Sequence, residues 1–255
     1  MKKPILSVII VTWNSAADID TCLSSLKKSL GSISHEVFII DNVSKDTTVK
    51  IIRSRYPWVK LFPQKINHGF GQGNNIGLAK AKGTYILLLN PDTKINTHAI
   101  KTMVSFLNTH PAVGAVGPEQ INGAGTIIHM KSRYSIIGTS EYWLEKIVSS
   151  IKKKSIILFP HPHRVSILNA GCLMAKSTIL PTKQWFDPAF FLYGEEEYLF
   201  QQIRSHGWKS YFLRNCSIIH YREKSIGQTG KKWKYVFQSF SLLFVQTIKR
   251  WLSRG

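Results

Sequence analysis

Residues 1–120 of this 255-residue chain alternate short apolar runs with segments of helical periodicity. The strand-like runs are residues 5–11, 36–40, 59–62 and 85–89. Between the first two, Ile19, Leu23, Leu26 and Leu30 recur at the three- and four-residue spacing of one helix face. Nearly continuous apolar runs are typical of parallel strands buried on both faces, and helices connect such strands. We therefore predict an α/β fold, with a Rossmann-like, mostly parallel sheet flanked by helices.

The composition is that of a folded chain, because 44% hydrophobic and 19% charged residues allow a substantial core and exclude disorder. Its three cysteines are far apart and lack metal-ligand spacing, which indicates buried thiols in a reducing compartment. The run 5–11 is too short for a signal peptide, and polar residues follow it where a cleavage site would lie. No apolar run approaches the length that spans a bilayer. We therefore predict a cytoplasmic protein.

The charge is strongly positive, since 34 Lys and Arg against 14 Asp and Glu give a formal net charge of +20. Such a charge favours polyanionic partners: nucleic acid, an anionic membrane surface or phosphate-bearing substrates. The basic residues are spread along the chain and cluster most clearly in an aromatic segment, not in a recognised nucleic-acid-binding motif. A basic nucleic-acid-binding protein is therefore an alternative, but we do not expect nucleic acid as a partner.

Polar residues stand where the predicted strands end. They are Thr12 and Asn14, Asp41, and Asp92. In open α/β sheets, ligands bind beyond the carboxyl ends of the strands. Asp92 follows the turn Asn90-Pro91, and its oxygens can coordinate a hard cation that bridges the phosphates of a sugar nucleotide. The alternative is that Asp92 is a turn residue that caps the next helix, and Asp41 is likewise either a turn residue or an acceptor for a base or ribose.

Residues 67–77 are dense in glycine, but they match neither a P-loop nor a dinucleotide-binding fingerprint. Two interpretations stay open: a flexible loop that leads into a helix, and a loop that cradles the nucleotide. Further along, residues 121–165 have no regular pattern, and we interpret them as an irregular excursion around the acceptor side.

Two later segments carry candidate chemistry. Glu195, Glu196 and Glu197 begin a predicted helix, where the macrodipole favours carboxylates, and a solvated first turn is the plainest interpretation. The preceding segment 187–194 is strongly aromatic, however, and a carboxylate beside apolar walls suits a base that removes a hydroxyl proton. His220 closes the mostly apolar strand 216–219 and could complete a metal site at the same sheet edge.

Together these segments resemble family 2 glycosyltransferases with the GT-A fold, in particular their rhamnosyltransferase-like branch. The resemblance covers roughly residues 5–225, and its motifs are residues 7–14, 40–42, 67–77, 87–93, 114–118, 169–172, 186–187, 190–193, 195–196 and 220. It implies a single in-line displacement that inverts the anomeric centre, with Mg²⁺ or Mn²⁺ as cofactor. The donor would be a nucleotide-diphosphate sugar of the dTDP-rhamnose or UDP-hexose type. The acceptor would be a glycan or lipid-linked precursor in cell-envelope polysaccharide synthesis.

The resemblance also implies roles for individual residues. Glu196 would be the catalytic base, with Glu195 as the alternative, and Asp92 and His220 would be the metal ligands. The nucleotide-sugar-binding residues would be Thr12, Asn14, Asp41, Asn67, Gly69, Asn74 and Asp92, and the acceptor and donor pocket would include Gly171 and Tyr193. Two departures matter, because Glu196 replaces the family's usual Asp and Tyr198 stands where many relatives carry a second acid. A non-catalytic relative is therefore a further alternative.

The C-terminal segment 231–254 has six basic residues and no acidic one. Its large apolar side chains recur at three- and four-residue spacing: Trp233, Phe237, Phe240, Phe244, Ile248 and Trp251. This is the pattern of a basic amphipathic helix in a membrane interface, and a helix packed on the domain is the alternative. We predict a GT-A domain over 1–226 and an amphipathic helix over 227–255, which would make the protein peripheral on the inner face of the cell membrane.

Overall fold

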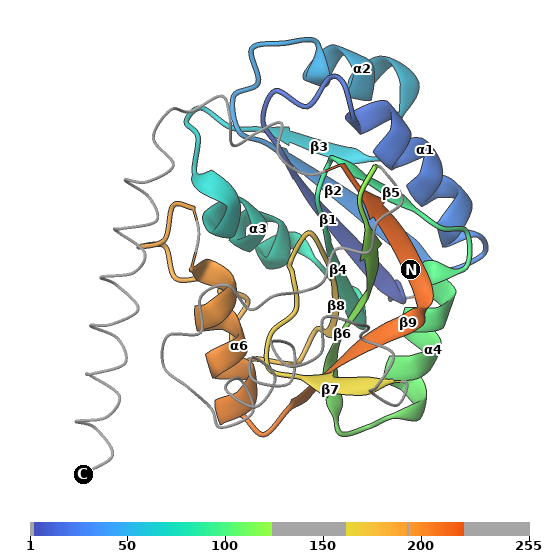
Figure 1. Ribbon diagram of the computed structural model, residues 1–255. Coiled ribbons are helices and arrows are strands. Elements are labelled where there is room, and N and C mark those ends of the chain that lie inside the picture. The colour runs from blue at the N-terminus through green and yellow to red at the C-terminus, as the bar shows by residue number, and fades with distance from the viewer. Residues whose placement is uncertain (1–2, 124–161, 193, 222–255) are drawn as a thin grey trace, which may run out of the picture.

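One nine-stranded sheet organises the residues that this computed structural model describes, which are 3–123, 162–192 and 194–221 (Figure 1). The strand order is β3-β2-β1-β4-β8-β6-β9-β5, and β7 pairs with β9. The sheet confirms the predicted α/β class. The predicted helix over 227–255, the domain boundary before it, and most of the segment 121–165 lie outside the described residues.

The first four strands are parallel and carry the regular alternation of the sequence. They are β1 (Leu6–Thr12), β2 (His35–Asp41), β3 (Lys60–Pro63) and β4 (Tyr85–Leu89). Three helices connect them: α1 (Ile19–Leu30), α2 (Thr48–Arg55) and α3 (Gly69–Lys80). All five residues of β4 are buried, as expected for a parallel strand covered on both faces.

The rest of the sheet mixes strand directions. Its elements are β5 (Thr93–Ile95), α4 (Ala99–Thr109), β6 (Val113–Ile121), β7 (His163–Val165), β8 (Cys172–Lys176), α6 (Glu195–Ser205) and β9 (Lys209–His220). Strand β8 runs antiparallel to β4, and β9 runs parallel to β6. The predicted strand 216–219 is the last part of the longer strand β9, whose far end pairs with β5. The pairing of β5 with β9 brings the neighbourhood of Asp92 next to His220.

The sheet separates two apolar cores. In β1, Val8 and Ile10 face the core beneath α1 and α4, whereas Ile9 faces the core beneath α3 and α6. Figure 1 shows these helix pairs on opposite sides of the sheet. This alternation is the period-two geometry of a strand. Among the described residues, no helix is both long and apolar enough to cross a bilayer.

The glycine-rich segment is a helix and not the loop that the sequence suggested, because α3 begins at Gly69. A Cβ on Gly77 would lie 2.5 Å from Ile9 Cγ2, and one on Gly73 would lie 2.8 Å from Val11 Cγ1. Both distances are shorter than side chains tolerate. The glycines therefore let α3 pack closely on β1.

Candidate functional site

The predicted donor-side residues lie at the carboxyl ends of β1 and β2, where Thr12 and Asp41 are paired across the strands. Thr12 Oγ1 donates to Asp41 Oδ1 at 3.0 Å, and the Ser44 hydroxyl donates to the same oxygen. The Ser44 N–H donates to Asp41 Oδ2 at 3.0 Å. Asp41 is only 2% exposed. Its carboxylate thus orders the loop that follows β2.

Two residues with positive φ mark the adjoining loops, Asn14 at 49° and Val43 at 63°. A β-branched residue in this region is strained unless its surroundings hold it there. Asn14 ties the two loops together, because its Oδ1 accepts from the Lys45 N–H at 2.7 Å and its N–H donates to Ser44 Oγ at 2.9 Å. The donor-side loops are therefore fixed by the protein's own hydrogen bonds.

The residues predicted around the start of α3 have structural partners. Asn67 Oδ1 accepts from the Gly69 N–H at 2.8 Å, and Asn42 Nδ2 donates to Gly69 O at 3.0 Å. Gly69 has a φ of +74°, and a Cβ there would lie 2.2 Å from Phe191 O, so only glycine fits. Asn74 is 1% exposed, and its amide donates to Phe70 O within the helix. Contacts of these residues with a nucleotide stay predictions.

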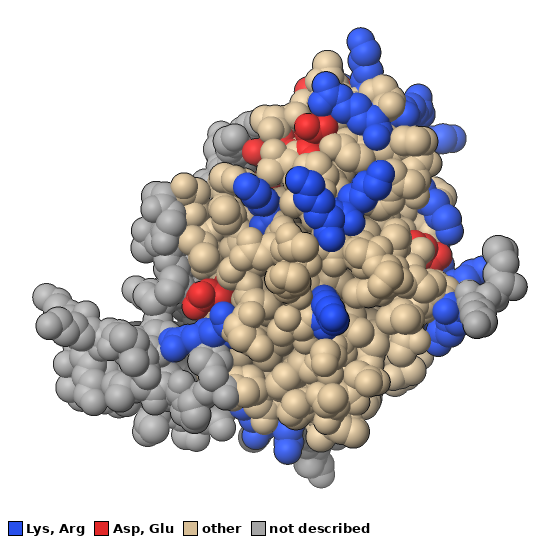
Figure 2. All heavy atoms as spheres, turned by 90° about the vertical axis from the view of Figure 1, so that its right-hand side faces the viewer, with Lys and Arg blue, Asp and Glu red and all other residues tan. Residues whose placement is uncertain are grey.

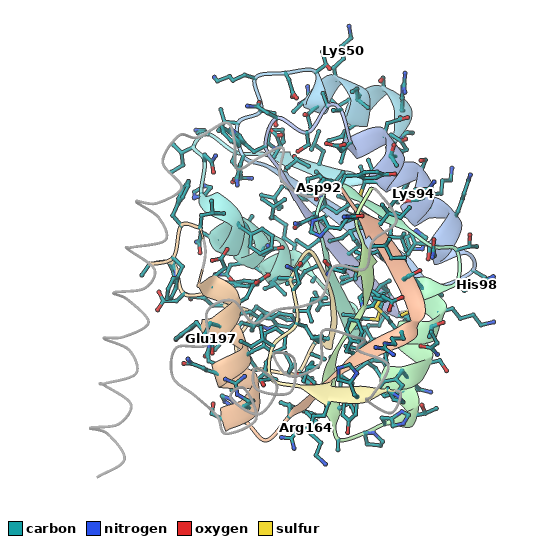
Figure 3. The ribbon with its side chains drawn as sticks, in the orientation of Figure 1. Lys50, Asp92, Lys94, His98, Arg164 and Glu197 are labelled. Carbon is teal, nitrogen blue, oxygen red and sulfur yellow. The ribbon has the colours of Figure 1, made fainter. Side chains whose placement is uncertain are left out.

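The predicted metal ligands Asp92 and His220 come together because β5 pairs antiparallel with the end of β9. Thr93 is the register partner of His220, and the Tyr221 N–H donates to Asp92 O at 2.9 Å. His220 Nε2 lies 3.1 Å from Asp92 Oδ1. Both groups are largely shielded from solvent, and Figure 3 shows Asp92 near the upper end of the sheet.

This pair fits a divalent cation that also binds phosphates. Asp92 Oδ1 is buried, and no described residue donates a hydrogen bond to it, so a buried anionic oxygen faces an imidazole nitrogen. The described residues contain no group of three His, Cys, Asp or Glu side chains able to hold a metal. Mg²⁺ in phosphate-handling sites is commonly held by one or two carboxylates, waters and substrate phosphates, and imidazole suits Mn²⁺ better.

The turn before β8 joins the metal pair to the candidate base. Glu196 Oε1 accepts from the Ala170 N–H at 2.7 Å. On the same turn, Gly171 O accepts from the Asn90 N–H at 2.8 Å. A Cβ on Gly171 would lie 2.7 Å from His220 Cε1, so glycine permits the close approach of this turn to the histidine. Gly171, predicted in the pocket, thus lies between His220 and the residue that binds Glu196.

The three adjacent glutamates of α6 have different surroundings. Glu195 is 5% exposed, and burial, reinforced by the charge of Glu196, raises the pKa of Glu195 to about 8. Burial also raises the pKa of Glu197, against the opposing effect of Arg204, whose Nη2 lies 3.7 Å from Glu197 Oε1. Figure 3 labels Glu197 on α6. Only Glu196 is bound to the turn beside the metal pair, which favours it over Glu195 as the base.

Tyr193 lies outside the described residues, so its place in the pocket stays a prediction. Two residues near the site had no role from sequence alone. Gln120 Oε1 lies 3.1 Å from His220 Nδ1, and Gln120 Nε2 donates to Asn169 Oδ1 at 3.4 Å. The sequence signal was a glutamine near the end of the mostly apolar segment 113–121, and the structure shows that this glutamine is 1% exposed.

Comparison with solved structures identifies the fold. A mannosyltransferase from Pyrobaculum calidifontis, bound to GDP-Man and Mn²⁺, superposes with a TM-score of 0.64 at 17% identity over 96% of this chain and 65% of its own. TarS residues 1–349 of S. aureus, bound to UDP-GlcNAc, gives 0.62 at 17% identity over 88% of this chain and 61% of its own. The described fold is therefore that of the GT-A glycosyltransferases.

The glycosyl transferase family 2 model matches residues 7–168, more than half of the chain, and the chain belongs to this family. A relative in Mycobacterium tuberculosis, an N-acetylglucosaminyl-diphospho-decaprenol L-rhamnosyltransferase, is 23% identical over 88% of this chain and 78% of its own length. The poly(ribitol-phosphate) β-N-acetylglucosaminyltransferase TarS of Staphylococcus aureus is 29% identical over 47% of this chain and 22% of its own. The chain thus spans only a small part of the full-length TarS.

Proposed function

We propose that this chain is an inverting glycosyltransferase that moves one sugar from a nucleotide-diphosphate donor to a hydroxyl of a glycan or lipid-linked acceptor. The observation that carries the proposal is the turn at 169–171. It contacts His220 of the metal pair on one side and binds Glu196 on the other. A diphosphate held at the pair and a hydroxyl activated by the glutamate would therefore meet beside this turn.

The proposed sugar transfer requires one proton acceptor from the protein. The acceptor oxygen attacks the anomeric carbon from the side opposite the diphosphate, the bond from that carbon to the phosphate oxygen breaks, and the diphosphate leaves with the electron pair. The hydroxyl proton passes to the Glu196 carboxylate, which the Ala170 N–H orients. A displacement from the opposite face inverts the anomeric centre.

The cation site would consist of Asp92 and His220, completed by donor phosphates and water. A Mg²⁺ or Mn²⁺ ion held there would offset the negative charge that develops on the leaving diphosphate. The ordered loops around Thr12, Asn14 and Asp41 would hold the base and ribose, because they lie at the same carboxyl edge of the sheet.

The donor and acceptor classes come from the relatives. One related enzyme is named for transferring rhamnose to a diphospho-decaprenol-linked sugar, and another for adding N-acetylglucosamine to poly(ribitol phosphate). We therefore propose a dTDP-rhamnose or UDP-hexose donor and an acceptor in cell-envelope polysaccharide synthesis. A cytoplasmic protein on the inner membrane surface, held partly by residues 231–254, is consistent with a lipid-linked acceptor.

A thermal-shift screen tests the donor site. The full chain is heated with dTDP-rhamnose, UDP-glucose, UDP-N-acetylglucosamine or GDP-mannose, each with and without Mn²⁺. Since a ligand that binds only the folded state stabilises it, one donor should raise the melting temperature, and Mn²⁺ should increase that rise. The Asp92→Asn variant should lose the increase. If no nucleotide sugar stabilises the chain, it is a non-catalytic relative and the proposal is wrong.

Product stereochemistry tests the mechanism separately. With the stabilising donor and a hydroxyl acceptor, proton NMR of the product reports the configuration of the new glycosidic bond. We expect the configuration opposite to that of the donor. Retention would rule out single displacement while leaving the donor assignment intact.

A further inference from the structure

We propose that Gln120 and Asn169 are positioning residues that hold the His220 ring in one orientation, with a hydrogen on Nδ1 donated to Gln120 and with Nε2 directed at Asp92. The proposal deepens the proposed function, since it rests on the metal pair. It explains why the buried amide of Gln120 lies between His220 and the side chain of Asn169, although all three residues are distant in sequence.

The direction of the hydrogen bonds follows from one obligate donor. The Gly171 N–H donates to Asn169 Oδ1 at 2.8 Å, which identifies that atom as the oxygen. Gln120 must then direct its amide nitrogen toward the same oxygen, at 3.4 Å, because two oxygens there would repel. Gln120 Oε1 is consequently turned to His220 Nδ1, 3.1 Å away. An amide oxygen only accepts, so Nδ1 carries the hydrogen.

The other ring nitrogen, Nε2, then faces two groups. Asn90 Nδ2 lies 3.5 Å from Nε2, which suits an amide donor, and Asp92 Oδ1 lies 3.1 Å from it. An unprotonated Nε2 and a carboxylate oxygen this close repel each other, so either a proton on Nε2 or a bound cation must offset that repulsion. Two ligands of one cation, each at about 2.1 Å and at right angles, are about 3 Å apart. The pair therefore has the separation that a shared cation requires.

The strands β6 and β9 bury the hydrogen bond between Gln120 and His220. Gln120 is 1% exposed and His220 is 3% exposed, so water cannot easily replace either partner. Gln120 reaches the histidine because the register between β6 and β9 shifts between Pro118 and Glu119, which makes Ile218 the partner of Gln120. In metalloproteins, groups that orient a ligating imidazole typically contribute about 10- to 100-fold to metal affinity.

The test combines a tautomer measurement with metal binding. Nitrogen-15 NMR of histidine-labelled, metal-free protein, with His220 assigned through His220→Gln, should show Nδ1–H in the wild type. Gln120→Met removes the acceptor, so the proton should move to Nε2, where Asp92 can accept it. Mn²⁺ affinity, measured from the EPR signal of free Mn²⁺, should then fall by about 10- to 100-fold.

Two variants make the result interpretable. Gln120→Glu keeps an acceptor for Nδ1 but places an oxygen against Asn169 Oδ1, so we expect a hydrogen on Nδ1 and a smaller loss of Mn²⁺ affinity than in Gln120→Met. Gln202→Met, on α6, removes a glutamine that donates to Trp185 O and should change neither readout. The proposal is overturned if metal-free His220 has no hydrogen on Nδ1, or if Gln120→Met keeps the wild-type hydrogen on Nδ1. If instead His220→Gln leaves Mn²⁺ binding unchanged, the proposed metal site fails while the tautomer result stands.

A separate observation is a basic face formed by α1, β5 and α4, and we infer that this basic face docks on an anionic lipid surface. Its exposed cations are Lys27, Lys28, Lys94 and Lys101. The segments that form it, residues 21–35 and 93–118, contain no Asp or Glu. Figure 2 views the molecule from this side, with most lysines and arginines in the upper half of the face and a group of acidic side chains beside them.

Charge and position favour a lipid surface over nucleic acid. Each Lys near an anionic leaflet adds to the attraction between the protein and the membrane. Stacking aromatics, which single-stranded nucleic acid requires, are missing, because Ile5 and Ile66 are the only large hydrophobic side chains exposed among the described residues. Lys94 lies two residues after Asp92 on the strand that pairs with β9. A docked membrane would therefore lie beside the proposed transfer site.

Vesicle co-sedimentation of the full chain tests this face. The patch variant combines Lys27→Gln, Lys28→Gln, Lys94→Gln and Lys101→Gln. The control variant makes the same change in charge elsewhere, at Lys65, Lys80, Lys82 and Lys183. With phosphatidylglycerol vesicles at low salt, the patch variant should bind at least about tenfold more weakly and the control nearly as wild type. Equal loss in both variants, or loss of duplex DNA binding without loss of vesicle binding, would overturn the inference.

Discussion

Asp41 and Asp92 lie at the same carboxyl edge of the sheet, but their carboxylates have different partners. Asp41 accepts three hydrogen bonds from Thr12 and Ser44, so its negative charge is used within its own loop. Asp92 Oδ1 is buried without a hydrogen bond from any described residue and faces His220 Nε2. A satisfied carboxylate stabilises a loop, whereas an unsatisfied one beside an imidazole is suited to a ligand. The four predictions below test this contrast and the site around Asp92.

The largest expected effect is on turnover, through Glu196→Gln. The amide keeps the shape of the side chain but cannot accept the hydroxyl proton, so kcat should fall by about 10²- to 10⁴-fold. Steady-state transfer assays measure this, and donor-induced thermal stabilisation should stay at the wild-type level. Equal activity of Glu196→Gln and wild type, with loss in Glu195→Gln, would move the base to Glu195.

Asp92→Asn should have the next largest effect, on metal binding. The change removes the anionic ligand, so Mn²⁺ affinity should fall by more than the roughly 10- to 100-fold that loss of a supporting group produces. Titration calorimetry measures it. Unchanged Mn²⁺ affinity would show that Asp92 is only a turn residue, as its position after Asn90-Pro91 also allows.

Asp41→Asn should have the opposite effects: a loss of stability without a loss of Mn²⁺ affinity. Loss of the charge weakens the bonds from Thr12 and Ser44, and the free energy of unfolding should fall by about 1–3 kcal/mol. Urea denaturation measures this loss. Mn²⁺ affinity of the folded protein should match the wild type, and a large loss of metal affinity would mean that the two carboxylates act as one site.

The smallest effect concerns the pH dependence of stability at Glu195. Its pKa is raised to about 8, so the stability that its protonated form contributes is fully present below the unfolded pKa and is lost as the pH rises through about 8. Glu195→Gln cannot ionise, and relative to wild type it should gain at least about 1 kcal/mol between pH 5 and pH 9. Parallel denaturation curves at the two pH values measure the gain. An equal difference at both pH values would contradict the raised pKa.

Much of the fold was predictable because local patterns carry it. The four apolar runs became β1 to β4, and the helical spacing of Ile19 to Leu30 became α1. The glycine-rich segment was misjudged because glycine density is typical of loops, whereas here a close approach to Ile9 and Val11 selects glycine within a helix. The mixed strand directions beyond β4 had no comparable local signal, since β8 and β9 pair with strands distant in sequence.

The candidate site also has one part that the sequence predicted and one part that it did not. Asp92, Glu196 and His220 were candidates because each stands at a strand end or helix start. Gln120 and Asn169 were not assigned roles, because a lone amide in a sequence does not reveal its partner. Their contribution depends on a register shift between the parallel strands β6 and β9, which are far apart in the sequence.

By itself, the sequence determined the α/β class, the order of the first strands, and the residue types at the carboxyl edge of the sheet. Hydrophobic periodicity is a property of neighbouring residues, so it can be seen without the fold. Only the tertiary structure decided which carboxylate is satisfied by its own loop and which faces a histidine. Contacts between residues of different strands depend on strand pairing and register. At this edge of the sheet, they give Asp41 and Asp92 different partners.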